Sequence, residues 1–541
     1  MANPIQSPWQ RLGALLKLDK STVSQLYLYA FLSGILSLSL PLGIQSVIHF
    51  IQGGQITTSW IILITLVILG VIITGWLQIM QLRLTENIQQ SIYIRYSFDF
   101  AYRFPRFNRM ALKGKIPSEL MNRFFDIVSL QKGIAKVLLD VTASTLQIIF
   151  SLLVLSFYHP FYIGFSIALI ILLYLVFRPL IKLGFNTSLE ESKYKYKTAH
   201  WLQEIAKADW SFRLAPNGAH YLNQLDEHTH SYLNSREKHF KVLWTQYIWM
   251  IAIKAVIVAS LLGLGGYLVI DQQMNLGQFV AAEVLILLLL GAVEKMIQNL
   301  ETLYDVFTSL EKLGQVQDIP LTFEEKTTLE NSNLFPMELI ETNGPKASVV
   351  LSIDALQHTM IHCTNQRNAA AFLRQMIDPT ASETRKPRWN FSIPQGDVLA
   401  TQLEQIGWFA KGVHLFEGSL KNNILLGRPE LNNEDLQKAL ETVGMAYFPY
   451  QMKEGYDVLL SKSTKLLSEE ERERILIARA IVHQPKALLL SLHGLALSTI
   501  DKTNLLKSIQ ENYPETTIIC TYSVDLMPQW NQLSLNTITQ S

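Results

Sequence analysis

The segment from Lys465 to Asp501, KLLSEEERERILIARAIVHQPKALLLSLHGLALSTID, decides how the second half of the chain folds. Ser468, followed three residues later by Glu471, forms a capping box, in which each side chain bonds the backbone of the other residue at a helix start. Acidic residues in a first turn also suit the positive end of the helix dipole. After this helix comes the apolar run Ala487–Leu490. The segment therefore predicts a capped helix that leads into a buried strand.

This helix and strand resemble, without a gap, the signature helix and Walker B strand of ATP-binding-cassette (ABC) ATPases. The family sequence LSGGQ is replaced by Leu467–Glu471, which reads LSEEE. Ser491 stands where the family has the Mg²⁺-binding Asp, and Leu492 where it has the Glu that polarises the attacking water. Ser498 replaces the Asp of the following loop. The resemblance implies an α/β, P-loop-NTPase-like domain from which this chemistry has been removed.

Three further positions of the family pattern have also changed. The phosphate loop, G-x-x-x-x-G-K-[ST], falls on Cys363–Leu373, where no glycine remains and Ala369 and Ala370 replace the Lys and the hydroxyl residue. Lys411 replaces the Gln that senses Mg²⁺, and Tyr522 replaces the switch His. Because these groups hold phosphate and Mg²⁺ in the family, the resemblance predicts a degenerate domain with no catalytic residue, no metal and no cofactor of its own.

The acidic signature has two readings. In the family each ATP lies between the phosphate loop of one chain and the signature of the other, so Glu469 and Glu470 would face the ATP of a partner. A carboxylate about 4 Å from phosphate costs roughly 4 kcal/mol at an effective dielectric of ~20. The second reading is that Ser468, Glu469 and Glu470 serve the helix start alone. We favour the second reading, in which the helix is kept for folding.

The composition divides the 541 residues into a membrane part and a soluble part. The chain is 49% hydrophobic and only 17% charged, and the long apolar runs lie within residues 1–300. A net charge of +1 gives no sign of nucleic-acid binding. Cys363 and Cys520 lack metal-ligand spacing and suit a reducing cytosolic compartment.

Six apolar segments are each close to the ~20 residues that cross a bilayer. They are residues 25–51, 58–81, 137–158, 160–183, 245–270 and 277–299. The long connections 84–135 and 185–240 are rich in Lys and Arg, which places both of them and both termini in the cytoplasm. The predicted protein is therefore multi-pass in a cell membrane and in contact with lipid.

Six spans with two long cytoplasmic connections, followed by a soluble domain, resemble half of an ABC exporter. Phe98–Pro105 and Gly277–Glu283 resemble bacterial exporters of the type I secretion kind, which lie in the inner membrane. In that family the long connections contact the nucleotide domain, and we expect those contacts at Pro105–Pro117 and Ala206–His220. The receiving surface of the domain matches at Leu415–Ile424.

Two ionisable residues lie inside apolar spans. Lys254 and Glu283 are candidates for a translocation pathway, because charge within a membrane segment is by default a pathway hypothesis. Packing or interfacial roles are the alternative for both, since Glu283 is close to the outer loop. Glu294-Lys295 is expected at the inner interface.

We expect four parts along the chain. They are a cytoplasmic segment 1–22, an all-α exporter-type membrane domain 23–314, a linker 315–345 and a shortened, degenerate ABC-type domain 346–541.

The leading hypothesis is a catalytically silent half-transporter. It would form a heterodimer with an intact ABC half that supplies Mg-ATP hydrolysis, and a periplasmic adaptor would extend the assembly. A homodimer is the alternative assembly. A different class is a non-transporting membrane scaffold or regulator, and a third hypothesis is nucleotide binding without hydrolysis in another pose.

Overall fold

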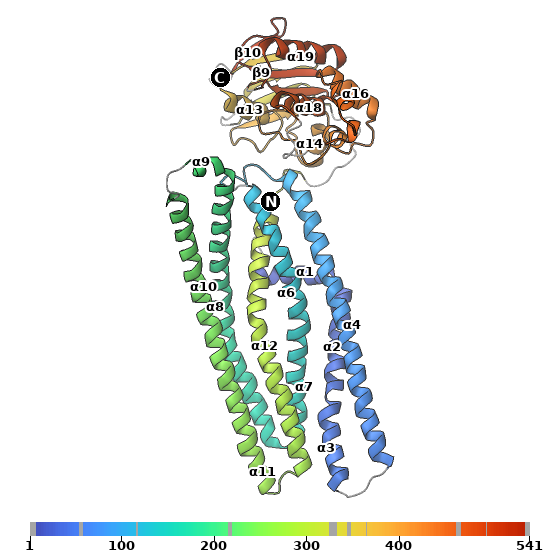
Figure 1. Cartoon of the computed structure of the whole chain (residues 1–541), viewed down its shortest axis with the longest axis vertical. Helices are drawn as coiled ribbons and strands as arrows, with labels where there is room; N and C mark the ends of the chain where they lie inside the picture. The colour runs from blue at the N-terminus through green and yellow to red at the C-terminus, as the bar shows by residue number, and fades with distance from the viewer. Residues whose placement is uncertain are drawn as a thin grey trace. The chain divides into compact units, whose positions relative to one another are not determined.

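The computed structural model describes residues 7–52, 58–114, 117–214, 219–323, 333–342, 348–363, 365–460, 467–493 and 495–535. The chain divides into two compact units, which are described separately (Figure 1). The helical unit comprises residues 1–105 and 114–319, and the α/β unit comprises residues 106–113 and 320–541.

The helical unit is built from long helices joined by short turns. Its α-helices are α1 (Pro8–Leu18), α2 (Lys20–Ser37), α3 (Ser39–Gln52), α4 (Thr58–Arg103), α5 (Pro117–Met121), α6 (Asp126–Lys136), α7 (Thr142–Tyr158), α8 (Pro160–Lys207), α9 (Asp209–Arg213), α10 (Ala219–Ser260), α11 (Gly266–Ile270) and α12 (Leu276–Gln317). Single π-helical turns, η3 (Val137–Val141) and η4 (Leu261–Gly265), join α6 to α7 and α10 to α11.

Six helical stretches are long and apolar enough to cross a membrane, which confirms the predicted spans. They are Lys20–Ile51, Thr58–Arg106, Glu119–Tyr158, Pro160–Lys207, His220–Ile270 and Leu276–Gln317. At 1.5 Å per residue, the 48 residues of Pro160–Lys207 extend about 72 Å, more than twice the ~30 Å of bilayer hydrocarbon. The charged connections predicted at 84–135 and 185–240 are therefore largely helical continuations of the spans.

Helix α12 is the packing centre of this unit. It contacts α3, α6, α7, α8 and α10 (Figure 1). Leu289, Val293, Ile297, Leu300 and Tyr304 follow one another at helical spacing and are all buried in one apolar cluster. A span surrounded by other helices explains why its apolar residues are not confined to one narrow stripe.

The first span is interrupted near Pro41. Helix α2 ends at Ser37, and α3 begins at Ser39 after the cap residue Leu38. Proline lacks the N–H that would bond the carbonyl four residues earlier, which here is that of Ser37. The break therefore lies where the missing hydrogen bond weakens the helix.

The α/β unit contains a five-stranded parallel sheet in the order β10-β3-β9-β8-β5, a three-stranded antiparallel sheet in the order β2-β1-β4, and the pair β6-β7. The strands are β1 (Met337–Glu341), β2 (Ser348–Ile353), β3 (Thr359–His362), β4 (Arg385–Trp389), β5 (Ile406–Phe409), β6 (Gly418–Ser419), β7 (Leu459–Leu460), β8 (Ala487–Ser491), β9 (Thr517–Tyr522) and β10 (Asn531–Ser534). The helices are α13 (Gln366–Gln375), α14 (Gly396–Leu403), α15 (Leu420–Leu425), α16 (Asn433–Thr442), α17 (Phe448–Gln451), α18 (Glu469–Ile481) and α19 (Thr499–Asn512).

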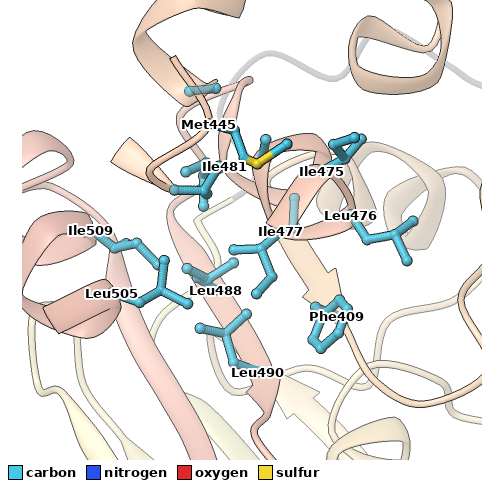
Figure 2. Close-up of a cluster of buried hydrophobic side chains, with 14 of the residues drawn as sticks. Phe409, Met445, Ile475, Leu476, Ile477, Ile481, Leu488, Leu490, Leu505 and Ile509 are labelled. Carbon is cyan, nitrogen blue, oxygen red and sulfur yellow. The ribbon is translucent and has the colours of Figure 1, made fainter. Parts of the chain in front are cut away.

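Both faces of the parallel sheet are covered, as a parallel sheet requires. On one face, Leu488 and Leu490 of β8 pack with α18 and α19 (Figure 2). On the other face, Leu489 of the same strand packs with α13 and with the antiparallel sheet. The apolar run predicted as a strand is buried along its whole length because alternate residues serve two cores.

The segment predicted as a linker contains regular structure. Helix α12 continues to Gln317, and β1 occupies Met337–Glu341 between β2 and β4. Met337 and Leu339 are fully buried, but so short an apolar pattern does not stand out in a polar stretch.

Partly buried His483, between α18 and β8, is expected to make stability depend on pH. Burial, aided by the Arg428 guanidinium, lowers the pKa of His483 from 6.5 to about 4. The unfolded chain therefore binds a proton below pH 6.5 that the folded chain does not. Stability is full above pH 6.5 and decreases toward pH 4, by at most about 1.4 kcal/mol per pH unit.

The measurement is the melting temperature of the full chain in detergent between pH 4 and 7. His483→Gln should flatten the acid decrease, and His414→Gln, at an exposed histidine, should not. Parallel curves for the parent and His483→Gln would contradict the assignment.

Candidate functional site

The carboxyl ends of the central parallel strands bring several predicted positions to one edge of the sheet. His362 pairs with Tyr522 between β3 and β9, and Ser491 pairs with Thr521 between β8 and β9. This edge is where ligands bind in open α/β sheets. We call it the carboxyl edge.

The phosphate-loop position is occupied by the start of α13. Asn365 caps the helix, and its side-chain oxygen accepts the Arg367 N–H at 2.9 Å. The helix begins at Gln366, inside the predicted loop frame, where no glycine is present to favour a loop. Ala369 is fully buried in the core and Ala370 is partly buried. Neither offers an ammonium or a hydroxyl group to a phosphate.

The Walker B positions present hydroxyl and alkyl groups instead of carboxylates. Ser491 and Thr521 are 1% and 0% exposed, and neither hydroxyl has a hydrogen-bond partner within the described ranges. Leu492 is 0% exposed and packs in the core between the sheet and α18, while its N–H donates to the Thr521 carbonyl at 3.0 Å. These positions therefore supply no ligand for Mg²⁺ and no general base.

A lysine–tyrosine pair occupies the switch position. The Lys502 ammonium donates to the Tyr522 hydroxyl at 3.2 Å and lies 4.7 Å from the ring centroid. The ring of His493 is 5.4 Å from the Tyr522 ring. Burial, and then the Lys502 charge, lower the pKa of His493. Lys502 itself is only 5% exposed, so the pair closes this part of the carboxyl edge.

The remaining two loop positions are those of Lys411 and Ser498. Lys411 is exposed, two residues after β5. Ser498 caps α19: its hydroxyl accepts the Asp501 N–H at 3.1 Å and donates to the Asp501 carboxylate at 2.6 Å. Ser498 is thus fully used by the helix start.

The signature position forms the predicted capping box at the start of α18. The Ser468 hydroxyl accepts the Glu471 N–H at 3.2 Å, and the Glu471 carboxylate accepts the Ser468 N–H at 2.8 Å. Glu470 forms an ion pair with Arg474 at 2.8 Å, whereas Glu469 is exposed. The carboxylates near the helix start therefore have structural partners, apart from that of Glu469.

Ser468→Ala should lower the free energy of unfolding by about 1 kcal/mol, because the cap bond to the helix backbone is lost. Chemical denaturation of the full chain in detergent measures this change. Ser523→Ala, at an exposed serine, should change stability by no more than about 0.5 kcal/mol. Equal effects would show that the cap does not stabilise the fold.

Mg-ATP is the ligand that a fold of this type implies, and the residues of the carboxyl edge do not fit it. Phosphate needs the cationic and backbone donors of a glycine-rich loop, and Mg²⁺ needs at least one carboxylate beside any hydroxyl ligand. Ala369 and Leu492 are core side chains, and Ser491 is buried beside Thr521. Among the described residues, no group of three or more His, Cys, Asp or Glu side chains could hold a metal ion.

Residues 106–113, which lie inside the first of the two contact segments predicted for the long connections, belong to the α/β unit. The Arg109 N–H donates to the Thr380 hydroxyl at 3.3 Å, and its guanidinium lies 3.5 Å from the Asp378 carboxylate. The Asn108 N–H donates to the Pro320 carbonyl at 2.9 Å. Helix α9 belongs to the helical unit.

One of the two predicted pathway residues has an ion-pair partner in the helical unit. Lys254 of α10 forms an ion pair with Glu294 of α12 at 2.5 Å, and the adjacent Lys295 pairs with Asp140 of η3 at 2.9 Å. Glu283 is exposed and has no hydrogen bond or ion pair with any residue that the structure describes. Glu294 and Lys295, which are neighbours on α12, thus connect this helix to α10 and to η3.

The sequence interpretation missed the partners of these groups. No motif marks Lys502 in the sequence, although its place one turn into α19 could have suggested a contact with Tyr522. Lys254 and Glu294 are opposite charges within two apolar spans, and that coincidence could have suggested their pairing. Asp140 lies at a π-helical turn that the sequence does not indicate.

No protein-family model matches the chain. It is 23% identical over 412 residues to a lactococcin-A transport/processing ATP-binding protein of Lactococcus lactis, a match that covers 72% of this chain and 56% of the relative. It is 25% identical over 281 residues to an exotoxin translocation ATP-binding protein of Pasteurella aerogenes, covering 49% and 38%. Identity reaches 31% over 143 residues with an uncharacterised ABC transporter ATP-binding protein of Bacillus subtilis, covering 26% and 25%.

The chain thus spans about half the length, or less, of these curated relatives. The similarity nevertheless agrees with the architecture, in which six membrane-capable helices precede a parallel-sheet α/β domain. The chain therefore has the architecture of a multi-pass membrane protein, and its relatives are ABC exporter and secretion ATP-binding proteins.

Proposed function

We propose that the chain is the catalytically silent half of an ABC-type exporter, paired with a subunit that hydrolyses ATP. The observation that carries this proposal is the carboxyl edge of the sheet. There, the position of the catalytic Glu is filled by Leu492, a fully buried core residue, and the position of the Mg²⁺-binding Asp by Ser491. Acids and metal ligands at such positions contribute orders of magnitude to phosphoryl transfer.

The architecture supports a role in transport. The six spans provide a membrane part, and the chain contributes residues 106–113 as well as residues 320–541 to the α/β unit. Relatives are named for lactococcin transport and for exotoxin translocation, which favours an export role in a bacterial inner membrane with both termini cytoplasmic. A periplasmic adaptor would extend the assembly in such a membrane.

A heterodimer is the assembly that we propose. In the family arrangement, the acidic start of α18 would face the partner's ATP. Arg474 compensates Glu470, which leaves the exposed Glu469 as the charge that would weaken that second site. Two copies of this chain would assemble without any intact site, so Mg-ATP would be held by the partner's own loops.

Affinity capture tests the proposal directly. The tagged full chain is purified from its native membranes, and the accompanying proteins are identified by mass spectrometry. We expect an ABC subunit with an intact phosphate loop and Walker B Glu. The captured complex should hydrolyse ATP, with a loss of at least about 100-fold when the partner's Walker B Glu is changed to Gln. Ser491→Ala in this chain should leave the rate within about twofold.

Two outcomes would reject the proposal. Mg-ATP hydrolysis by the purified chain alone, without an ABC partner, would show that it is not silent. Capture of only non-ABC proteins would favour the second candidate, a membrane scaffold or regulator in which the α/β unit is a docking module. The observation that supports the scaffold or regulator is that segment 106–113 belongs to the α/β unit.

A further inference from the structure

A cavity of about 540 Å³ lies within the α/β unit, where residues 106–113 meet the C-terminal end of α13 and the loop that leads to β4. Its volume is in the range of pockets that hold small molecules. Its charged lining residues are three cations and one carboxylate, namely Arg109, Lys113, Arg374 and Glu383. We call it the arginine cavity.

Arg374, in the last turn of α13, is the decisive residue of this cavity. Its side chain is partly buried, yet no hydrogen bond or ion pair joins its guanidinium to any residue that the structure describes. Burial, and then the charge of Arg109, lower the pKa of Arg374 against the opposing effect of the Asp378 carboxylate. A cation in the last turn suits the helix dipole, but an exposed arginine would do so without losing water. The guanidinium therefore lacks an anion.

The carboxylates near the cavity are used by other groups. One oxygen of Asp378 accepts the Thr380 N–H at 2.8 Å and the Thr380 hydroxyl at 2.6 Å, and the other lies 3.5 Å from the Arg109 guanidinium. Lys113 and Glu383 are 3.6 Å apart and both are largely exposed, so their attraction is weak. Three cations thus share two carboxylates, and the surplus charge is positive.

The loop that forms one wall of the cavity is held by its own hydrogen bonds. The Ser382 hydroxyl accepts the N–H groups of Thr384 at 3.3 Å and of Arg385 at 3.2 Å. The Lys386 ammonium donates to the Pro379 and Ser382 carbonyls, each at 2.7 Å. Because this wall is already ordered, a ligand would bind here at a small cost in conformational entropy.

We propose that the arginine cavity binds a compact anion that carries two phosphate groups. The planar fork of a guanidinium matches phosphate oxygens, and two phosphates can serve the two guanidinium groups that repel each other. Among the described residues that line the cavity, none is aromatic, so the lining offers no face on which a nucleobase could stack. Inorganic pyrophosphate and a sugar bisphosphate both have the required chemistry.

A bound anion of this kind would join Arg109 to α13. It would add a contact between segment 106–113 and the rest of the α/β unit, beside the bonds of Arg109 to Thr380 and of Asn108 to Pro320. The proposal therefore assigns an effector site to the α/β unit. It goes beyond the export role and does not depend on it.

Calorimetric titration of the full chain in lipid nanodiscs tests the proposal, with EDTA present and without any partner. The probes are pyrophosphate, fructose 1,6-bisphosphate, orthophosphate and ADP. Pyrophosphate or the sugar bisphosphate should bind at least about tenfold more tightly than orthophosphate, because a second phosphate adds charged hydrogen bonds. ADP should bind no more tightly than pyrophosphate. The arm that binds more tightly identifies the source of the two phosphates.

Arg374→Gln should weaken binding by about tenfold or more, and Arg374→Lys, which keeps the charge without the fork, should weaken it less. Arg367→Gln is the matched control, because Arg367 is exposed on the same helix and does not line the cavity. It should bind the probes like the parent. If Arg374→Gln does not fold, Arg109→Gln removes the second guanidinium and gives the same test.

Melting temperature separates binding from a structural role of Arg374. Because Arg374 has no partner among the described residues, Arg374→Gln should melt within about 2 °C of the parent. The tighter probe should raise the melting temperature of the parent more than that of the variant.

Four results would overturn the proposal. They are no saturable binding of pyrophosphate or the bisphosphate up to about 1 mM, equal affinity for orthophosphate, tighter binding of ADP, and equal weakening by Arg367→Gln. The last result would place the anion at the start of α13 instead. Since the assay contains no ATPase, failure to capture an ABC partner would leave the result at this cavity intact.

Discussion

Leu492→Glu is expected to destabilise the α/β unit by about 3–5 kcal/mol and to restore no ATP hydrolysis. The substitution reinstates the carboxylate that the family uses, but the side chain at this position is 0% exposed and lies in the main core cluster. A charge without a partner in such a place costs about that much. With folded domains stable by only about 5–15 kcal/mol, much of the population could unfold.

Leu492→Gln and Leu492→Met separate the charge from the change in shape. Gln has the size of Glu without its charge, and Met should cost less than about 1.5 kcal/mol. The difference between the Glu and Gln variants should grow as pH rises from 4 to 8, because the folded state resists ionising a buried carboxyl. Denaturation of the full chain in detergent at several pH values measures this. Equal stability of the Glu variant and the parent at pH 8 would show that position 492 still opens to solvent.

Around position 492, part of the site could be predicted from the sequence and part could not. The frame of the α18–β8 segment was enough to propose which residues replace the family ligands. It could not show that Leu492 points into the core, or that Ser491 and Thr521 lie side by side as buried hydroxyls. Those facts depend on pairing between β8 and β9, whose sequences are about 30 residues apart.

The fold was easier to predict from the sequence where a long periodic pattern was present. Six apolar segments predicted six spans, and the Ser468–Glu471 spacing predicted the start of α18. Short elements were harder, since β1 has five residues and lies within the stretch taken for a linker. Its burial comes from β2 and β4, which follow it in the chain, so no local signal could reveal it. The ion pairs of α12 are likewise contacts between distant segments.

The last large effect is expected at Asn423, within the segment Leu415–Ile424 that the family resemblance predicts to face the membrane domain. Its side chain is 0% exposed and holds the preceding loop by bonds to Phe416: the carboxamide donates to the Phe416 carbonyl at 2.9 Å and accepts the Phe416 N–H at 3.0 Å. Arg479 of α18 donates to the same side-chain oxygen at 2.8 Å. Burial lowers the pKa of Arg479 to about 10, which still leaves the guanidinium charged at neutral pH.

Asn423→Leu should therefore cost about 3–5 kcal/mol, because it leaves the N–H and C=O of Phe416 without their partner and removes the Arg479 bond to the side chain, although Arg479 keeps its bonds to the Asn423 and His414 carbonyls. The neighbouring Asn422 is exposed and makes no side-chain hydrogen bond that the structure records, so Asn422→Leu is a matched control expected to change stability by no more than about 0.5 kcal/mol. Denaturation of both variants in the full chain measures the difference. If both asparagines tolerated leucine equally, the loop would be held by its apolar contacts. If only Asn423 fails, the loop that precedes α15 is fixed from beneath by α18, and this helix keeps a structural task that needs no nucleotide.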